Sequence, residues 1–253
     1  MGRDSLMKTG NHLVIDADIP VYQIGFSCES AVDWGDDFWS LSGDMNEARE
    51  LFTIWVNNVR EATGMDNVLM ALTSGANWRA KLCPTYKVNR KESRKPVLFN
   101  PLRDFIRHNW MTTEIDTLEA DDILGLYSSF PTNVLVSADK DLLTVPGRHF
   151  NPMKPEDGII VVTPEMAYRY HMTQTLTGDS TDNYKGCPGV GPKGAEKLMD
   201  GLELEEIWPA VVERYGKAGL TEDDAILQAR LAYIMRPGDY DYETGEVKLW
   251  NPR

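Results

Sequence analysis

The chain has 253 residues, of which 42% are hydrophobic, and a formal net charge of −13. This length and apolar content predict one large domain, or a core with a small, closely packed subdomain, and no apolar run is long enough to suggest a membrane protein. The three cysteines are widely spaced, which argues against a zinc or disulfide framework and favours a reducing, cytoplasmic compartment.

Five short apolar runs predict buried strands, and helical spacing follows several of them. The runs are HLVID (12–16), NVLMALTSG (67–75), MTTEID (111–116), NVLVSADKD (133–141) and GIIVVT (158–163). Strands that alternate with helices favour an α/β fold, in which a mostly parallel central sheet carries helices on both faces.

Capping residues mark the predicted helices. Residues 45–63 have apolar positions at helical spacing between Asp44, a good N-cap, and Gly64, a helix stop. A second helix is expected around 101–109, and a third after Thr117, which we expect to be its N-cap.

The remaining elements are a further pair of helices and two hairpins. Thr163 and Pro164 form a strong helix start, and TEDDAILQARLAYIM (221–235) is a capped amphipathic helix. The acidic segment 29–44 and the segment 239–250 are expected to be hairpins.

Positive charge is concentrated in one segment of this acidic chain. Residues 79–95 (RAKLCPTYKVNRKESRK) contain seven basic residues and one acid, so the segment carries +6 and the rest of the chain −19. An exposed, solvated loop is one interpretation, and a binding site for phosphate is the other.

Acidic residues recur where the predicted strands and helices begin or end: Asp16, Glu119, Asp121, Asp122, Asp139, Asp141, Asp179 and Asp182. Right-handed crossovers bring the carboxyl ends of parallel strands to one edge of the sheet, so these eight carboxylates are expected to converge there. A helix cap or an exposed loop explains any single acid, but four separate clusters favour a common site.

Eight carboxylates in one crevice repel one another unless cations lie between them. Oxygen ligands without His or Cys favour Mg²⁺, with Mn²⁺ as a substitute, over zinc. Two such ions about 4 Å apart are a common device for displacement at phosphorus, where one activates water and the other stabilises the leaving oxygen. The acids therefore predict hydrolysis of a phosphate ester with two metal ions.

A glycine- and proline-rich turn follows the last pair of acids. In GCPGVGPKGAEKL (186–198), Pro192 marks a helix start, Gly189 and Gly191 lie in the turn before it, and Lys193 lies in the first helical turn. Free N–H groups at such a helix N-terminus bind phosphate. An ordinary turn is the alternative, but a second phosphate contact outside the metal crevice predicts a polymeric substrate.

Five motifs occur in order: IDAD (15–18), RAKLCPTYKVNRK (79–91), LEADD (118–122), SADKDLL (137–143) and GDSTDNYKGCPGVGPKGAEKL (178–198). Together they resemble the 5′→3′ exonuclease and flap endonuclease family, over roughly residues 11–200. The basic segment and the ending DYDYETGEVKLW are most similar to the short 5′→3′ exonucleases of T-seven-like bacteriophages.

The resemblance implies a PIN-like nuclease core over residues 1–163, with a basic, arch-like segment at 78–100. It implies a helix–three-turn–helix DNA-binding subdomain with a C-terminal helical and hairpin extension over 164–253. One metal is expected to be surrounded by Asp16, Glu119, Asp121 and Asp122, and the second by Asp139, Asp141, Asp179 and Asp182.

Lys87 and Arg90 are expected to meet the scissile phosphate, so the resemblance makes them catalytic residues together with Asp16 and Asp121. The full set of implied DNA contacts is Arg79, Tyr86, Lys87, Arg90, Lys91, Arg94, Gly189, Gly191 and Lys193. A potassium ion is expected at the carbonyl groups of the glycine turn.

The implied activity is 5′→3′ exonuclease with flap endonuclease and RNase H-type capacity, on duplex DNA with 5′ ends or flaps and on RNA–DNA hybrids. The resemblance places it in phage DNA replication, in primer removal and in degradation of host DNA. It further implies a monomer in the host cytoplasm, with replisome proteins such as a polymerase or a single-strand-binding protein as partners.

One position departs from the family pattern. Ser74 stands where the family usually has an aspartate at the end of the second strand, Asp66 lies at the wrong end of that strand, and Asp18 is the nearest candidate to substitute. This leaves open a catalytically weakened, structure-specific DNA-binding protein. The other alternative is a haloacid-dehalogenase-type phosphatase with Asp16 as nucleophile, which leaves the basic segment and the glycine turn unexplained.

Overall fold

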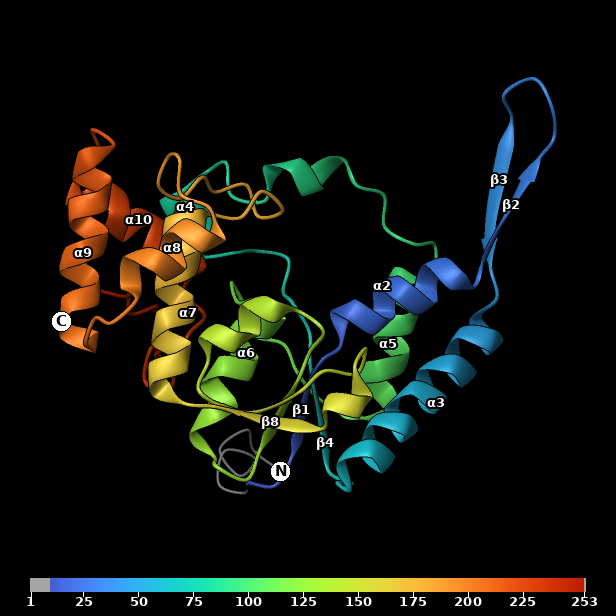
Figure 1. The fold of residues 1–253 in the computed structure, drawn as a ribbon. Coiled ribbons are helices and arrows are strands. Elements are labelled where there is room, and N and C mark those ends of the chain that lie inside the picture. Colours follow the sequence, from blue (N-terminus) through green and yellow to red (C-terminus); the bar gives the residue numbers. More distant parts are fainter. Residues whose placement is uncertain (1–9, 253) are drawn as a thin grey trace.

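The structure is a computed structural model that describes residues 10–252, apart from the side chains of residues 91 and 92. Its centre is a six-stranded sheet (Figure 1) made of β1 (Leu13–Asp16), β4 (Val68–Ala71), β5 (Met111–Thr113), β6 (Val134–Val136), β7 (Gly147–Phe150) and β8 (Ile159–Val162). The strand order is β5-β4-β1-β6-β7-β8, and all neighbours pair in parallel except β7 and β8. The expected α/β class is confirmed.

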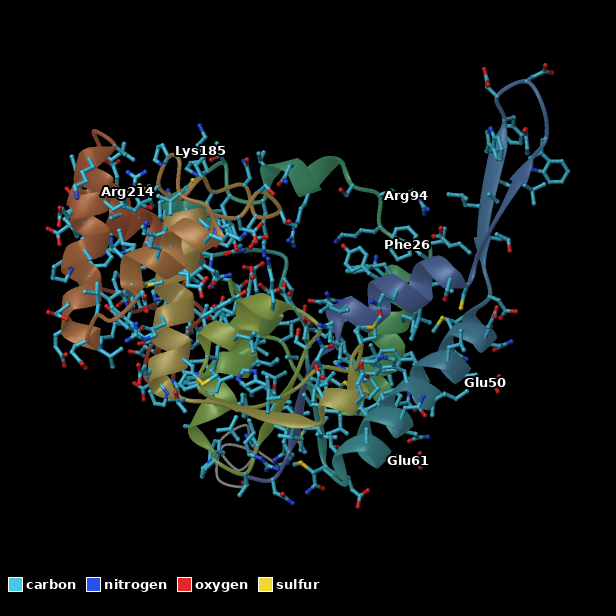
Figure 2. The ribbon with its side chains drawn as sticks, in the orientation of Figure 1. Phe26, Glu50, Glu61, Arg94, Lys185 and Arg214 are labelled. Atoms are coloured by element: carbon cyan, nitrogen blue, oxygen red, sulfur yellow. The ribbon has the colours of Figure 1, made fainter. Side chains whose placement is uncertain are left out.

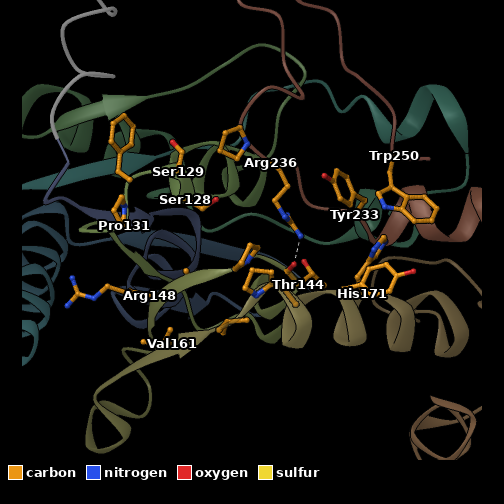
Figure 3. A pocket seen from close by; sticks show the side chains of 18 residues that line it. Ser128, Ser129, Pro131, Thr144, Arg148, Val161, His171, Tyr233, Arg236 and Trp250 are labelled. Atoms are coloured by element: carbon orange, nitrogen blue, oxygen red, sulfur yellow. Dashed lines mark hydrogen bonds between the residues drawn. The ribbon is translucent and has the colours of Figure 1, made fainter. Parts of the chain in front are cut away.

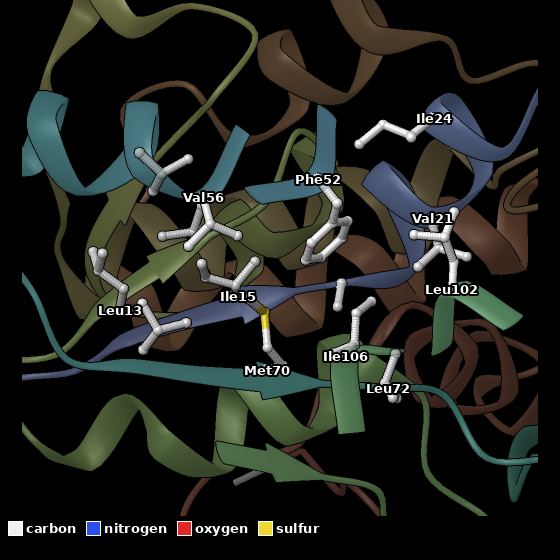
Figure 4. Packing of buried hydrophobic residues seen from close by; sticks show 14 of the residues in the cluster. Leu13, Ile15, Val21, Ile24, Phe52, Val56, Met70, Leu72, Leu102 and Ile106 are labelled. Atoms are coloured by element: carbon white, nitrogen blue, oxygen red, sulfur yellow. The ribbon is translucent and has the colours of Figure 1, made fainter. Parts of the chain in front are cut away.

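The central strands are buried on both faces, as their continuous apolar sequences predict. Alternate side chains of β1 enter different clusters: Leu13 and Ile15 pack on one face, and Val14 packs on the other. Figure 4 shows the first face, where Phe52 and Ile106 from covering helices pack against the strands. Truncation of such fully buried side chains to alanine costs on the order of 2–5 kcal/mol, so the sheet gives the site a rigid base.

Helices cover the two faces of the sheet unequally. The first face is covered by α2 (Asp18–Ser27), α3 (Met45–Thr63) and α5 (Phe99–Asn109), and the second by α6 (Ala120–Leu126). Helix α3 begins and ends as predicted: the Asp44 side chain accepts from two backbone N–H groups, and Gly64 ends the helix with a φ of 66°.

One expectation about the core was wrong, and one strand was not predicted. Thr117 has a φ of 66° and does not cap α6; Glu119 is the N-cap, in a reciprocal capping box with Asp122. Strand β7 was not predicted because its sequence, GRHF, is short and half polar. As a result, the segment 158–163 contains an antiparallel edge strand rather than another parallel one.

The C-terminal third builds a separate helical layer from α7 (Pro164–Thr177), α8 (Pro192–Met199), α9 (Leu204–Lys217) and α10 (Glu222–Ala232). Thr163 caps α7 and Thr221 caps α10, both as predicted. The helices share a third apolar cluster, which includes Met172, Trp208 and Tyr215 and contains no residue from before position 168. This separate core supports the division between residues 163 and 164, which stays a prediction.

Several short elements complete the chain: α4 (Arg79–Leu82), η1 (Val88–Glu92), η2 (Tyr127–Ser129), η3 (Lys140–Thr144) and η4 (Pro155–Asp157). The acidic hairpin is confirmed as β2 (Glu29–Asp33) paired with β3 (Trp39–Gly43), and it projects beyond the sheet and its helices (Figure 1). In the expected hairpin at 239–250, one bridge joins Tyr240 and Val247. Within residues 10–252 no helix is both long and apolar enough to cross a membrane.

Candidate active site

The carboxyl ends of β1 and β6 open into a cavity of about 410 Å³. Asp16 ends β1, Asp139 follows β6 as the N-cap of η3, and Glu119 and Asp121 lie at the N-terminus of α6. All four side chains line the cavity. The parallel topology therefore brings together acids from three segments that are far apart in the sequence.

The carboxylates of the cavity are poorly compensated. Burial, with the charges of Asp18 and Asp139, raises the pKa of Asp16 to about 7. Burial also raises the pKa of Asp121 well above its usual range, and the charges of Asp16 and Asp139 raise it further. Such shifts mean that the protein supplies too little positive charge, which is the electrostatic condition for binding a cation.

Three further acids extend this group beside Asp139. Burial, followed by the charges of Asp139, Asp179 and Asp182, raises the pKa of Asp141 to about 7. Asp179 and Asp182 lie in the loop that follows α7. Asp139 thus faces both parts of the group, the cavity acids and the acids around Asp141.

Two oxygen atoms in this group fit a hard cation especially well. The Oδ1 atoms of Asp121 and Asp141 are buried and accept no hydrogen bond, although buried acceptors normally have a partner. Among the described side chains of residues 10–252, no three Asp, Glu, His or Cys are close enough to form a coordination shell as they stand. The acids are nevertheless close enough to raise one another's pKa values.

The basic segment folds over the acids. The Lys87 ammonium group forms an ion pair with Glu119 and lies 3.3 Å from Oδ2 of Asp182. The Arg90 guanidinium lies 2.5 Å from Oδ1 of Asp182, and the Tyr86 hydroxyl donates to Oδ2 of the same residue at 2.9 Å. The left-handed φ of 52° at Lys87 turns the chain at this point. Lys87 and Arg90 also line the cavity, so both charges can reach a phosphate bound there.

Glu119 differs from the other cavity acids. Burial alone favours its neutral form, but the charges of Lys87 and Arg79 outweigh burial and lower its pKa to about 2. Burial lowers the pKa of the Lys87 ammonium group, but the charges of Glu119 and Asp182 outweigh burial and raise it. Glu119 is therefore ionised and already bound to cationic side chains.

Arg79 and Asp122 form a buried pair outside the cavity of 410 Å³. Their exposed fractions are 2% and 0%, and the guanidinium contacts both carboxylate oxygens, at 2.7 and 2.8 Å. Trp78 Nε1 and the Met235 N–H also donate to Asp122. Arg79 further donates to Oε2 of Glu119 at 2.9 Å. The structure thus separates Asp122 from the acids with which it was grouped, and turns Arg79 into the protein interior.

Asp18 was considered only as a substitute for the missing family aspartate. Its Oδ2 accepts from the Thr73 N–H at 2.9 Å, and its Oδ1 accepts from Arg103 at 3.0 Å. Arg103 also binds Glu114 at 2.8 Å. Ser74 lines the same cavity, and its hydroxyl donates to the Ala76 carbonyl at 3.0 Å. Asp18 therefore lies in the cavity wall next to the Ser74 segment, and burial raises its pKa although Thr73 and Arg103 act in the opposite direction.

The other predicted phosphate contacts in the basic segment are not all at the cavity. Arg94 forms an ion pair with Glu29 at 2.7 Å and stacks over the Phe26 ring (Figure 2), near the base of the acidic hairpin. The Lys91 side chain lies outside the described residues. Lys95, which was not singled out from the sequence, lines the cavity.

The glycine turn has the predicted form. Gly189 has a φ of 73°, Gly191 is the N-cap of α8, and no side chain caps that helix. Lys193 is exposed in its first turn. Arg214, which comes from α9 (Figure 2), donates to the Pro188 carbonyl at 2.8 Å and adds positive charge that the local sequence did not show. The free N–H groups at this helix start suit an anion.

With this geometry established, the chain can be compared with known proteins. Residues 12–173 match the family described as 5′-3′ exonuclease, N-terminal resolvase-like domain. The chain is 29% identical to the exodeoxyribonuclease of Enterobacteria phage T3 and to the exonuclease of Escherichia phage T7, over 95% of its own length and 93% of theirs. The solved flap endonuclease of bacteriophage T5, a pseudo-enzyme-product complex with DNA and metal ions, superposes with a TM-score of 0.54 at 15% identity, over 73% of this chain and 80% of that one.

The mostly parallel sheet of this chain, with acids at the carboxyl ends of its strands, is the PIN-like core of a 5′ nuclease. The chain belongs to the 5′→3′ exonuclease family, with relatives in bacteriophages. It is therefore a nuclease of the hydrolase class, and the phosphatase alternative is excluded.

Proposed function

We propose that this nuclease is a metal-dependent 5′→3′ exonuclease with flap endonuclease capacity, which cleaves phosphodiesters from the 5′ end of duplex DNA. The observation that carries the proposal is the group of poorly compensated carboxylates around Asp16, Asp121 and Asp141, with Lys87 and Arg90 directly over it. The T3 relative is an exodeoxyribonuclease, and the T5 structure contains DNA and metal ions, which supports both the substrate and the metal.

The acids fit two divalent cations, Mg²⁺ with Mn²⁺ as a substitute. Asp16, Asp121 and Asp139, with Glu119, would hold one ion, and Asp141, Asp179 and Asp182 the other. When bound, such ions activate water and stabilise the charge on the phosphate oxygens. We do not assign Asp122 to either ion, since its two oxygens are already bound to Arg79, Trp78 and Met235.

The chain's own cations position the phosphate. Lys87 and Arg90 are paired with Glu119 and Asp182, and these carboxylates are the ones proposed to bind metal. A phosphate at the cavity therefore offers each basic side chain a new anionic partner. Preorganised donors of this kind stabilise charge that develops in the transition state.

The second phosphate contact lies at the start of α8. Gly189, Gly191 and Lys193 would hold the duplex backbone, in a helix–three-turn–helix arrangement whose turn carbonyls suit a potassium ion. Because the site at Asp16 binds one phosphate and the helix start binds another, the substrate must be longer than a nucleotide. Such charge-assisted contacts predict binding that weakens steeply with salt.

The wider role follows the resemblance. We propose activity on RNA–DNA hybrids, primer removal, and degradation of host DNA during phage replication, by a monomer that works beside replisome proteins. The division into a core (1–163) and a DNA-binding subdomain (164–253) belongs to the same proposal.

The test is cleavage of a 5′-labelled duplex with a short 5′ flap, in Mg²⁺, in Mn²⁺ and in EDTA. Cleavage is expected with either metal and not in EDTA. Lys87→Ala should lower the rate by about 10²-fold, the scale on which a preorganised charge-stabilising group acts. Lys154→Ala, which removes an exposed lysine that does not line the cavity, is the matched control and should leave the rate unchanged. Cleavage that is undiminished in EDTA would contradict the metal-dependent mechanism.

A further inference from the structure

A second cavity, of about 670 Å³, lies at the opposite end of the parallel strands (Figure 3). Its walls come from η2 and the start of β7, from the first turns of α7, and from residues 233–237 and Trp250. None of the residues assigned above to metal or DNA lines it. Its size falls in the range of roughly 300–1,000 Å³ that is typical of small-molecule sites.

Two arginines line this cavity without a carboxylate in contact with their guanidinium groups, although the charges of Asp239 and Asp122 act on Arg236 from further away. Arg236 donates to the carbonyls of Ile234, Met235 and Thr144, and Arg148 donates to the carbonyl of Thr132. Among the described residues, no carboxylate oxygen lies within 4.0 Å of either guanidinium, although ion pairs occupy many other arginines. In a chain of net charge −13, two such arginines in one cavity point to an anionic ligand.

Aromatic rings form the other end of the cavity. The His171 ring lies 5.4 Å from Tyr233 and 5.2 Å from Trp250, and Trp250 packs edge-on against Trp208 at 5.1 Å. Figure 3 shows Arg148 and the Tyr233–Trp250 wall at opposite ends, with Arg236 between them. The fixed rings offer a surface on which a planar group can stack.

Two uncharged polar side chains, Thr144 and His171, also line the cavity. The Thr144 hydroxyl is fully buried and has no hydrogen-bond partner in the described part of the chain. Burial lowers the pKa of His171 to about 4, so the ring is neutral at pH 7 and its Nε2 is engaged by the Ala229 carbonyl. The positive charge of the cavity therefore comes from the arginines alone.

We propose that this cavity binds a nucleoside 5′-monophosphate, with the phosphate between Arg148 and Arg236 and the base against Trp250. The ligand combines an anion with a planar ring, as the two ends of the cavity require. This inference rests on the proposed function, because stepwise cleavage of DNA from the 5′ end would release such a molecule if each product kept its 5′-phosphate.

The cavity is connected to the active site by a short segment of backbone. Arg236 ends the segment 231–236, whose Leu231 and Tyr233 carbonyls accept from Arg79 at 3.2 and 2.6 Å. The Met235 N–H donates to Asp122 at 3.3 Å. A phosphate that draws Arg236 away from the Thr144 carbonyl therefore disturbs the hold on Arg79, which positions Glu119.

The expected consequence is inhibition by product at a site separate from the substrate. Added nucleoside monophosphate should lower kcat and leave KM for DNA nearly unchanged. Competition with DNA would instead raise KM, which is the signature of binding in the active site.

The test is equilibrium binding of deoxyadenosine 5′-monophosphate to the full chain in EDTA, without DNA, by calorimetry. Deoxyadenosine and inorganic phosphate are the comparison ligands. Arg148→Gln should weaken nucleotide binding about tenfold, the loss expected for one charge-assisted hydrogen bond. Trp250→Leu should weaken it as well, and Lys154→Gln, which removes an exposed charge outside the cavity, should not.

Arg236 variants are less informative because this side chain also binds three carbonyls of the fold. Three outcomes would overturn the proposal: no saturable binding at millimolar nucleotide, binding of phosphate as tight as that of the nucleotide, or binding lost in Lys87→Ala but unchanged in Arg148→Gln. Cleavage of the flap duplex without added nucleotide tests the nuclease separately, so the two proposals can fail independently.

Discussion

Asp121 and Asp122 are neighbours in the sequence, yet they lie in opposite electrostatic surroundings. Asp121 faces the cavity, its Oδ1 accepts no hydrogen bond, and its pKa is raised by burial and by other acids. Asp122 is fully buried, and Arg79, Trp78 and the Met235 N–H satisfy its oxygens. Asp18 is intermediate, because it binds Arg103 and yet burial raises its pKa as it raises that of Asp16.

The contrast distinguishes two uses of a buried carboxylate. A carboxylate with an arginine partner stabilises the fold, because removal of either partner leaves an unpaired charge. A carboxylate among other carboxylates destabilises the metal-free fold and becomes favourable when a cation binds. Substitutions on the two sides should therefore have opposite effects on stability and on activity.

The largest effect is expected from Asp121→Asn. Loss of a proposed metal ligand should lower flap cleavage by at least ~10²-fold, while the free energy of unfolding of the metal-free protein stays unchanged or rises, since one repelling charge is removed. Cleavage rates and urea unfolding in EDTA provide both quantities. A clear loss of stability would show that Asp121 is a structural residue like its neighbour.

Asp122→Asn should have the opposite profile. The change leaves Arg79 buried with less compensation, and loss of one partner of a buried pair costs on the order of 3–5 kcal/mol. Urea unfolding measures the loss, and the double variant Arg79→Met with Asp122→Leu should be less destabilised than the sum of the single changes. Additive losses would mean that the two side chains do not act as a pair.

The sequence predicted which acids converge but could not divide them into these two uses. LEADD places two aspartates next to each other at a helix start, and one residue of helix turns the side chain by about 100°. Which of the two faces the cavity depends on Arg79, which is 43 positions away from Asp122 in the sequence. Arg79 was predicted as a phosphate contact for the same reason, because the sequence shows that its side chain is charged but not that it is buried.

The fold was predictable where apolar runs were long enough. Strands β1, β4 and β6 follow from continuous apolar sequences, and the ends of α3 follow from Asp44 and Gly64. Strand β7 carries Arg148 and His149 in only four residues, so its place depends on pairing with β6. Thr117 had the chemistry of a cap, but its left-handed backbone excludes that role.

A smaller effect, which depends on pH, is expected from Asp141→Asn. Because burial and three nearby acids raise the pKa of Asp141 to about 7, its ionisation destabilises the metal-free fold as the pH rises from about 4 through 7. The stabilising influence of its neutral form is complete below the unfolded pKa and lost above the folded one. Asp141→Asn should therefore match the wild type below about pH 4 and become more stable than it as the pH rises, by on the order of 2–4 kcal/mol at pH 8.

The pH comparison uses unfolding in EDTA for both proteins at each pH. His149 and His171, whose pKa values burial lowers to about 4, destabilise both proteins alike as the pH falls, so they cancel in the difference. Mg²⁺ at pH 8 should stabilise the wild type more than the variant. A difference that is independent of pH would show that Asp141 is already compensated.

The smallest effect is expected at Ser74, where the chain departs from its family. Ser74→Asp adds a carboxylate to a cavity wall that already contains Asp16, Asp18 and Asp121, so it should lower the stability of the metal-free protein at pH 8 by about 1 kcal/mol. The same charge should reduce, by a few-fold, the Mg²⁺ concentration needed for half-maximal cleavage. Ser74→Asn, which has the same shape without the charge, is the control. If the aspartate variant cleaves and the natural chain does not, Ser74 marks a nuclease fold that binds DNA without cutting it, whereas a change in Mg²⁺ dependence alone places Ser74 at the edge of a working metal site.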